Sequence, residues 1–139
     1  MKKVTYEGVA VVVQKIIKES KAALNDVEFV VGISRGGLFP AMVVSTALMK
    51  PLIVAYIDKQ DRVYFDRGAW IRDKKVLLVD DIVRTGKTMD KIRELLLKKG
   101  VSLVKTLTSY YLSSTARHAP DYGKMTGKDI SFPWDEERT

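Results

Sequence analysis

The sequence predicts an α/β fold built on a parallel sheet, and two observations lead to that prediction. Apolar, strand-like runs alternate with segments of helical periodicity, which is the order of elements in βαβ units. One of these runs, Val76–Val79, is entirely apolar, as expected of a strand in a sheet that is covered on both faces. No repeat, low-complexity tract or linker divides the chain, so we expect a single domain over residues 1–139.

The first half of the chain supplies two helices and two strands in this scheme. Apolar residues recur at helical spacing from Tyr6 to Leu24, which predicts a helix with one buried face. The next elements are expected at Glu28–Ile33 (strand), Leu38–Met49 (helix) and Pro51–Ile57 (strand). Pro40 fits the second helix because proline is tolerated in the first turn. The charged segment Asp58–Arg67 is expected to form a mobile loop or an exposed ribbon.

The second half continues the alternation after the apolar strand. A helix is expected over Lys87–Lys99, because apolar side chains recur on one face and Gly100 provides a stop signal. A fourth strand is expected over Val101–Tyr111, and the remainder is predicted to be irregular. We therefore divide the domain into a core of about residues 1–111 and a small C-terminal segment of about residues 112–139.

Composition limits the class of protein. A chain that is 46% hydrophobic and 29% charged resembles an ordinary globular domain. It has no cysteine and one histidine, which excludes a disulfide framework and disfavours a zinc site. Glu7 precedes any long apolar run, which predicts no signal peptide, and no run of about 18 apolar residues exists to span a membrane. We expect a cytoplasmic protein with no membrane partner.

The net charge of +7 does not indicate a nucleic-acid partner. Lysine and arginine outnumber acids by a similar margin in both halves, and the two signs are interleaved. Nucleic-acid binders usually concentrate basic residues on one helix or face, so we expect no nucleic-acid partner. A small anionic substrate needs only a few local cations.

Two adjacent acids form the first part of the strongest chemical signal. Asp80 and Asp81 directly follow the apolar run Val76–Val79, and carboxylates placed there are costly unless they bind something. They could bind the hydroxyls of a sugar, a metal ion, or both. The plainer alternative is that the two acids only cap or solvate a turn.

The second part of the signal is a phosphate-binding pattern. Thr85, Gly86, Lys87 and Thr88 stand at the expected start of a helix, where free N–H groups and the helix dipole attract an anion. The glycine permits close approach, and the hydroxyls and the ammonium add donors. A P-loop is excluded because its first glycine would fall on Asp81. Acids that bind two sugar hydroxyls, next to a loop that binds a phosphate, together predict a phosphorylated sugar as the ligand.

A second loop leaves a strand at the same edge of the predicted sheet. Ser34, Arg35, Gly36 and Gly37 follow the strand expected at Glu28–Ile33. Ligands of parallel α/β sheets lie beyond the C-terminal ends of the strands. Both loops are therefore expected at the ligand-binding edge.

These motifs resemble those of type I phosphoribosyltransferases. Val76–Thr88 resembles their signature for phosphoribosyl pyrophosphate (PRPP): four apolar residues, two acids, two apolar residues and a Thr-Gly-x-Thr loop. Gly32–Pro40 looks like their pyrophosphate loop. Pro120–Gly123 and Phe132–Asp135 are similar to the tail of small microbial xanthine-guanine and hypoxanthine (purine) enzymes, where that segment forms a hood over the base. The resemblance covers nearly the whole chain.

The resemblance implies a Mg²⁺-dependent reaction in which a base displaces pyrophosphate from PRPP and a nucleoside 5′-monophosphate forms. Asp80 and Asp81 would hold the ribose hydroxyls, directly or through Mg²⁺, and act as the catalytic acids. The 5′-phosphate would lie on Thr85, Gly86, Lys87 and Thr88, and the pyrophosphate on Ser34, Arg35, Gly36 and Gly37. The segment Asp58–Arg67 stands at the family's mobile-loop position. Such enzymes are homodimers or homotetramers, and we expect the same here.

The residues expected to meet the base depart from the purine enzymes. Those enzymes usually place an Asp near the purine N7 where this chain has Arg84, and a guanidinium cannot act as a general base. Arg84 could instead donate to the base or to a phosphate oxygen. The position of the stacking aromatic residue is Asp129, so Ile130 is expected to pack on the ring, with Trp134 nearby. Simple core or dimer packing is the plainer interpretation of Trp134.

The leading hypothesis is a purine phosphoribosyltransferase of nucleotide salvage. Two alternatives stay open: a regulator that senses PRPP or a nucleotide on the same fold, and a transferase for another nitrogenous base. Arg84 motivates the first alternative, because it replaces the residue that contacts N7.

Overall fold

The computed structural model describes residues 1–66 and 71–138. In chain order the elements are β1 (Lys2–Lys3), α1 (Tyr6–Leu24), β2 (Phe29–Ile33), α2 (Leu38–Leu48), β3 (Leu52–Ile57), β4 (Val63–Phe65), β5 (Lys75–Val83), α3 (Lys87–Lys98), β6 (Leu103–Leu112), β7 (Tyr122–Thr126), β8 (Ile130–Ser131) and the 3₁₀ helix η2 (Pro133–Arg138). Within these ranges the main sheet has the order β4-β3-β2-β5-β6-β7, and every neighbouring pair is parallel except β3 and β4. The predicted α/β fold with a parallel sheet is confirmed.

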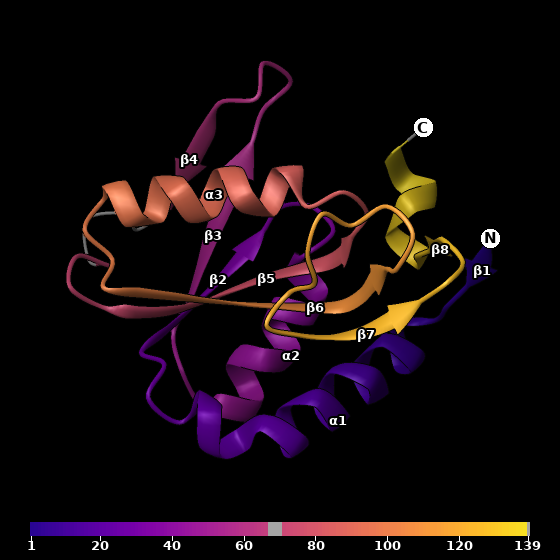
Figure 1. Cartoon of the computed structure of the whole chain (residues 1–139), viewed down its shortest axis with the longest axis horizontal. Coiled ribbons are helices and arrows are strands. Elements are labelled where there is room, and N and C mark those ends of the chain that lie inside the picture. The colour runs from indigo at the N-terminus through magenta and orange to yellow at the C-terminus, as the bar shows by residue number, and fades with distance from the viewer. Residues whose placement is uncertain (67–70, 139) are drawn as a thin grey trace.

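Helices cover both faces of the main sheet. Figure 1 shows α1 and α2 on one face and α3 on the other. Neighbouring residues of β5 point to opposite faces: Leu77 packs in the cluster that includes Val9, and Leu78 packs in the cluster that includes Ile92. All four side chains are fully buried. The apolar run in this strand is therefore explained by coverage on both sides, as the sequence predicts.

The helix ends follow the local sequence. The Oγ1 of Thr5 accepts a hydrogen bond from the N–H of Gly8 at 3.0 Å, which caps the start of α1 at the predicted residue. α3 ends at Lys98, and Gly100 adopts a left-handed φ of 93°, as the stop signal predicts. None of the helices in the described ranges combines the length and apolarity needed to cross a membrane.

The charged segment after β3 forms an exposed ribbon as far as it is described. β4 pairs antiparallel with β3, and the Oδ1 of Asp58 accepts the N–H groups of Gln60 and Arg62 at 2.9 and 2.8 Å across the turn. Asp66 closes the ribbon by accepting the N–H of Val54 at 2.9 Å. Arg67, the last residue of the predicted loop, lies outside the described residues.

The prediction of an irregular C-terminal segment is wrong. β7 extends the main sheet beside β6, β8 pairs with β1, and η2 follows. β7 is an edge strand with mostly exposed or half-buried side chains, so its sequence shows no alternation of buried and exposed residues. Asp121 fixes its start, because one carboxylate oxygen accepts the N–H of Thr106 at 2.8 Å. These partners are distant in sequence, and periodicity does not reveal them.

The N-terminal strand holds the C-terminal segment in place. Lys2 pairs with Ile130 and Lys3 with Ser131 in a separate two-stranded parallel sheet. The backbone N–H of Val4 adds a hydrogen bond to the carbonyl of Ser131 at 3.1 Å. The segment expected to cover the base is thus tied to the start of the chain as well as to the main sheet.

Candidate functional site

A cavity of about 360 Å³ lies at the C-terminal ends of β2 and β5. It is lined by Ile33, Ser34, Arg35, Gly36, Ile57 and residues 80–89. The structure therefore brings the two predicted loops and the paired acids to one cavity, at the edge of the sheet where the sequence places them. Of the residues predicted to hold anions, only Gly37 is absent from the lining.

The paired acids belong to a strand rather than to a loop. The sequence predicts a strand that ends at Val79, but β5 continues through Val83, and Asp80 pairs with Thr108 of β6. Asp80 is half-buried and Asp81 is only 7% exposed. The strand pairing extends over the acids because β6 continues beside them, which is a non-local effect.

Each acid is held by the backbone of the next residue. Asp80 Oδ1 accepts the N–H of Asp81 at 2.8 Å, and Asp81 Oδ1 accepts the N–H of Ile82 at 2.7 Å. The other oxygen of Asp81 accepts the indole N–H of Trp134 at 2.9 Å. Asp81 is thus anchored from the C-terminal segment, whereas Asp80 is the more exposed of the two acids that line the cavity.

The loop Thr85–Thr88, predicted to hold a phosphate, has a backbone geometry that suits an anion. Gly86 is the N-cap of α3 with φ 95° and ψ −2°, a left-handed conformation that favours glycine. Glycine has no side chain to cap the helix, and in the first turn the N–H of Lys87 donates to Thr85 Oγ1 at 3.3 Å. A Cβ on Gly86 would come no closer than 3.8 Å, to Val83 Cγ1. The first N–H groups of α3 and its dipole therefore face the cavity beside Lys87 and Thr88.

A segment that sequence reasoning leaves unassigned supports this loop from behind. The hydroxyl of Thr115 donates to the carbonyl of Arg84 at 2.6 Å, and the N–H of Arg117 donates to the carbonyl of Thr85 at 3.0 Å. His118 Nε2 lies 3.0 Å from Asp90 Oδ1 at the start of α3. No local spacing signals these contacts, because they join residues from different elements.

The loop Ser34–Gly37, predicted to hold pyrophosphate, packs closely against the sheet. The peptide bond between Ser34 and Arg35 is cis, and the N–H of Ser34 donates to the carbonyl of Ala55 at 2.8 Å. A Cβ on Gly37 would lie 2.6 Å from the carbonyl oxygen of Ile33 and 2.7 Å from that of Val79. Gly37 therefore serves close packing of this loop against β2 and β5, rather than the lining of the cavity.

The four residues predicted to meet the base do not form one open surface. Arg84 Nε lies 3.0 and 3.2 Å from the two carboxylate oxygens of Asp129, and an Arg84 terminal nitrogen donates to the carbonyl of Ile130 at 3.3 Å. The side chain of Ile130 is fully buried, and Trp134 is 6% exposed. Arg84 lines the cavity and the other three do not. Their contact with a base stays a prediction.

Trp134 is part of an aromatic cluster. Its ring stacks on Phe132 with a centroid distance of 4.8 Å and an interplanar angle of 9°. Tyr6 and Phe39 approach it at centroid distances of 5.6 and 5.8 Å. Burial raises the pKa of Tyr110, whose ring lies 6.4 Å from that of Phe132, so this phenol stays neutral near pH 7.

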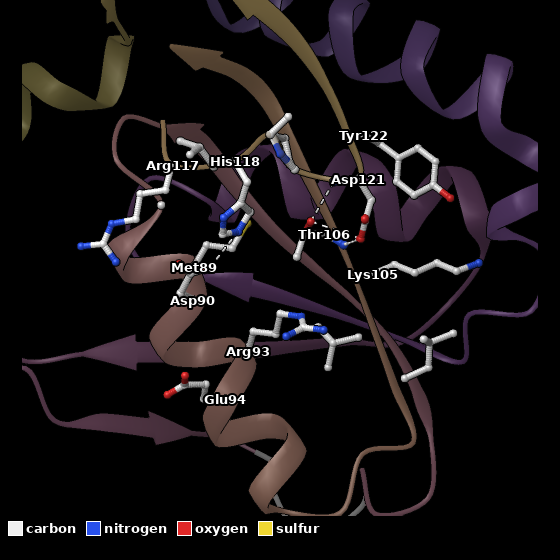
Figure 2. A pocket seen from close by; sticks show the side chains of 16 residues that line it. Met89, Asp90, Arg93, Glu94, Lys105, Thr106, Arg117, His118, Asp121 and Tyr122 are labelled. Carbon is white, nitrogen blue, oxygen red and sulfur yellow. Dashed lines mark hydrogen bonds and ion pairs between the residues drawn. The ribbon is translucent and has the colours of Figure 1, made fainter. Parts of the chain in front are cut away.

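A second, larger cavity of about 860 Å³ lies beside α3 and the first half of β6. Figure 2 shows that Arg93 and His118 come from different elements around it, and that Asp121 is joined to Thr106. The cavity contains neither of the paired acids nor the Ser34–Gly36 loop. We therefore place the candidate active site in the smaller cavity.

The smaller cavity brings paired acids and the start of a helix together at the edge of a parallel sheet. The family is shown by sequence: residues 5–138 match the phosphoribosyl transferase domain, and the chain belongs to that family. It is thus of the glycosyltransferase type. No match was found among curated proteins.

Solved structures agree with this assignment. A purine phosphoribosyltransferase from Pyrococcus horikoshii is 29% identical, with a TM-score of 0.82 over 96% of this chain and 94% of that chain. The xanthine-guanine-hypoxanthine phosphoribosyltransferase of Helicobacter pylori is 20% identical, with a TM-score of 0.76 over 99% and 96%. A hypothetical protein from Neisseria gonorrhoeae with bound ppGpp is 20% identical, with a TM-score of 0.78 over 96% and 89%. The last two likenesses show the fold.

Proposed function

We propose that this protein transfers the 5-phosphoribosyl group from PRPP to a purine-type base in nucleotide salvage. A ring nitrogen of the base forms a bond to C1 of the ribose while the bond from C1 to pyrophosphate breaks. The proton of that nitrogen leaves, and the products are a nucleoside 5′-monophosphate and pyrophosphate. The observation that carries this proposal is that one cavity joins the paired acids, the phosphate loop and the pyrophosphate loop.

Each part of PRPP has a matching part of the cavity in this proposal. The start of α3, with residues 85–88, takes the 5′-phosphate, because its N–H groups and dipole favour an anion. Arg35 and the backbone of its loop take the pyrophosphate. Asp80 and Asp81 take the ribose hydroxyls, and their negative charge stabilises the positive charge that develops on the sugar.

The acids also fit a Mg²⁺ ion that arrives with the substrate. The described residues contain no group of three or more acidic, histidine or cysteine side chains that could hold a metal alone. Mg²⁺ is commonly bound by one or two carboxylates together with substrate phosphates and water. The two carboxylates of Asp80 and Asp81 line the cavity and meet that requirement. The ion would neutralise pyrophosphate as it leaves.

The choice of a purine base is supported by the Pyrococcus horikoshii protein, whose base class is part of its description. The alternatives are a transferase for another nitrogenous base and a regulator that senses PRPP or a nucleotide. The bound ppGpp of the Neisseria gonorrhoeae structure and the ion-paired Arg84 favour keeping the regulator as the second candidate.

We also propose a homodimer or homotetramer, acting in the cytoplasm with no nucleic-acid or membrane partner. α2 carries no charged residue, yet Met42 within it is 56% exposed and Met49 at its end is 89% exposed. Apolar side chains on an uncharged helix support self-association.

PRPP with Mg²⁺ is expected to raise the melting temperature of the protein. A ligand that binds only the folded state at one hundred times its dissociation constant adds about 2.7 kcal/mol of stability, or roughly 5–15 °C for a domain of this size. Nucleoside 5′-monophosphates should also stabilise, and nucleosides should not. Differential scanning fluorimetry with the three ligands measures this. Equal shifts from a nucleoside and its monophosphate would contradict the phosphate role of residues 85–88.

A substitution in the loop Thr85–Thr88 and a turnover assay complete this test. Gly86→Val should remove the ligand-dependent shift, because a branched side chain enters the space for the phosphate and strains the left-handed backbone. Pyrophosphate release from PRPP and Mg²⁺ with single bases then separates enzyme from sensor. Stabilisation by PRPP with no release for any base would favour the regulator.

Arg84 is expected to influence the choice of base. Xanthine is the more acidic of the common oxopurines, and its anion is attracted by a guanidinium. Asp129 already neutralises part of that charge, since its carboxylate lies 3.0 Å from Arg84 Nε. Arg84→Asp should therefore lower the kcat/KM ratio of xanthine to guanine by about tenfold, and Asp129→Asn should raise it.

The double variant Arg84→Asp with Asp129→Arg is the matched control, because it restores an ion pair in the opposite direction. It should recover stability without recovering the base ratio. The competing role for Arg84 is to bind phosphate. Unchanged base ratios together with weaker PRPP binding in Arg84→Asp would establish that role instead.

A further inference from the structure

We propose that Trp134 is a positioning residue for PRPP, and that it acts through Asp81. This inference rests on the proposed function, because it assigns a task to one residue of that site. It differs from the base-contact role that the sequence suggests for Trp134, and it places the effect of this side chain on the sugar-phosphate substrate.

The carboxylate of Asp81 is fixed at both oxygens. Oδ1 accepts the N–H of Ile82 at 2.7 Å and Oδ2 accepts the indole N–H of Trp134 at 2.9 Å. The hydroxyl of Ser109 donates to the carbonyl of Asp81 at 2.5 Å, which fixes the backbone as well. The side chain is 7% exposed, so little water is available to replace a lost donor. Hydrogen bonds to a charged, poorly hydrated group are stronger than neutral ones.

The donor is itself held rigidly. Trp134 stacks on Phe132 at 4.8 Å, and Tyr6 of α1 and Phe39 of α2 pack against its ring. Indole nitrogen can only donate, and a carboxylate is an ideal acceptor for it. The position of the Asp81 carboxylate is therefore set by Trp134 and the aromatic residues packed around it, as well as by β5.

Two features distinguish positioning from direct contact. Trp134 is 6% exposed and does not line the cavity, whereas Asp81 does. The one polar atom of the Trp134 side chain is already committed to Asp81. Phe132 covers one face of the indole and Tyr6 and Phe39 pack around the rest, so a base finds neither a free ring face there nor a free donor. Trp134 can therefore affect a bound ligand only through its hydrogen bond to the Asp81 carboxylate.

Trp134→Phe tests this route, because phenylalanine keeps an aromatic ring and lacks the N–H. The dissociation constant of PRPP with Mg²⁺ should rise about tenfold, as expected when a carboxylate loses a charge-assisted donor. The KM of the base at saturating PRPP should change less than about twofold. In the double variant with Asp81→Asn, Trp134→Phe should add no further loss, since residues that act as one unit are not additive.

A spectroscopic signal reads the hydrogen bond directly. The chain has two tryptophans, Trp70 and Trp134, so Trp134→Phe assigns the indole N–H resonance in a ¹H–¹⁵N spectrum. In Asp81→Asn this resonance should move upfield, and in the wild type it should move on addition of PRPP and Mg²⁺. Ile17→Val, a core change on α1, controls for general loss of stability and should alter neither the resonance nor PRPP binding.

The outcomes are separable from those of the proposed function. A higher base KM with unchanged PRPP affinity would overturn positioning and restore base contact. Additive losses of PRPP affinity in the double variant would also overturn the positioning role. So would a Trp134 indole N–H resonance whose chemical shift changes neither in Asp81→Asn nor on addition of PRPP. If the wild type binds PRPP but transfers its phosphoribosyl group to no base, the transfer function fails, while the PRPP affinity of Trp134→Phe still decides the inference. If PRPP does not bind at all, both fail.

Discussion

Gly37→Ala is expected to destabilise the protein by about 1–3 kcal/mol and to abolish PRPP binding. The new Cβ would lie 2.6 Å from the carbonyl oxygen of Ile33, 2.7 Å from that of Val79 and 3.0 Å from the Cα of Asp80. All three are backbone atoms, so the collision is relieved only by moving the pyrophosphate loop away from the strands. That movement separates the loop from the paired acids. Urea unfolding and PRPP calorimetry measure the two effects.

Gly127→Ala is the matched control for this prediction. A Cβ at Gly127 would meet no atom within 4 Å, and its backbone is not left-handed. The free energy of unfolding should therefore stay within about 0.5 kcal/mol of the wild type. If Gly37→Ala were equally neutral and bound PRPP normally, the close contact between the loop and the two strands would not be required.

Asp80→Asn is expected to leave a folded protein and to lower turnover by at least about tenfold, equivalent to about 1.4 kcal/mol of transition-state stabilisation. The amide keeps an oxygen that can accept the N–H of Asp81, so the local backbone contact survives. It loses the negative charge that the proposed function assigns to contact with the ribose. Steady-state rates with saturating PRPP, beside a thermal melt, measure the change.

Asp81→Asn should show a comparable loss of turnover but a larger loss of stability, because this side chain also holds Trp134. Asp73→Asn is the control, since Asp73 has a left-handed φ of 65° that asparagine tolerates and it does not line the cavity. If Asp80→Asn and Asp81→Asn both unfolded while the wild type bound no PRPP, the acids would be structural.

Local patterns predict most of the helices and the position of the site. The bounds of α1 follow from its apolar spacing, and the end of α3 follows from Gly100. The paired acids and the two anion loops meet at one cavity because parallel strands end at a common edge. These features depend on residues that are close in sequence or on a general rule of sheet topology.

The C-terminal segment could not be predicted in the same way. Its contacts join distant residues: Trp134 to Asp81, Asp129 to Arg84, and Ile130 to Lys2. The sequence suggests four of these residues, Arg84, Asp129, Ile130 and Trp134, as base contacts, yet in the structure all four make contacts that hold the segment in place. Chemical type alone does not show whether a polar side chain is already satisfied by the protein. Only the tertiary contacts decide that.

The pairing of β1 with β8 has a consequence for the order in which the protein matures during synthesis. The ribosome makes Lys2 long before Ile130, so β1 waits for its partner while the residues between them emerge. The strands from β2 to β6 can pair before that point, because their crossovers are complete. Trp134 emerges later still, and until then Asp81 lacks its indole donor. A nascent chain should therefore pair β2 to β6 before the contact between Trp134 and Asp81 forms.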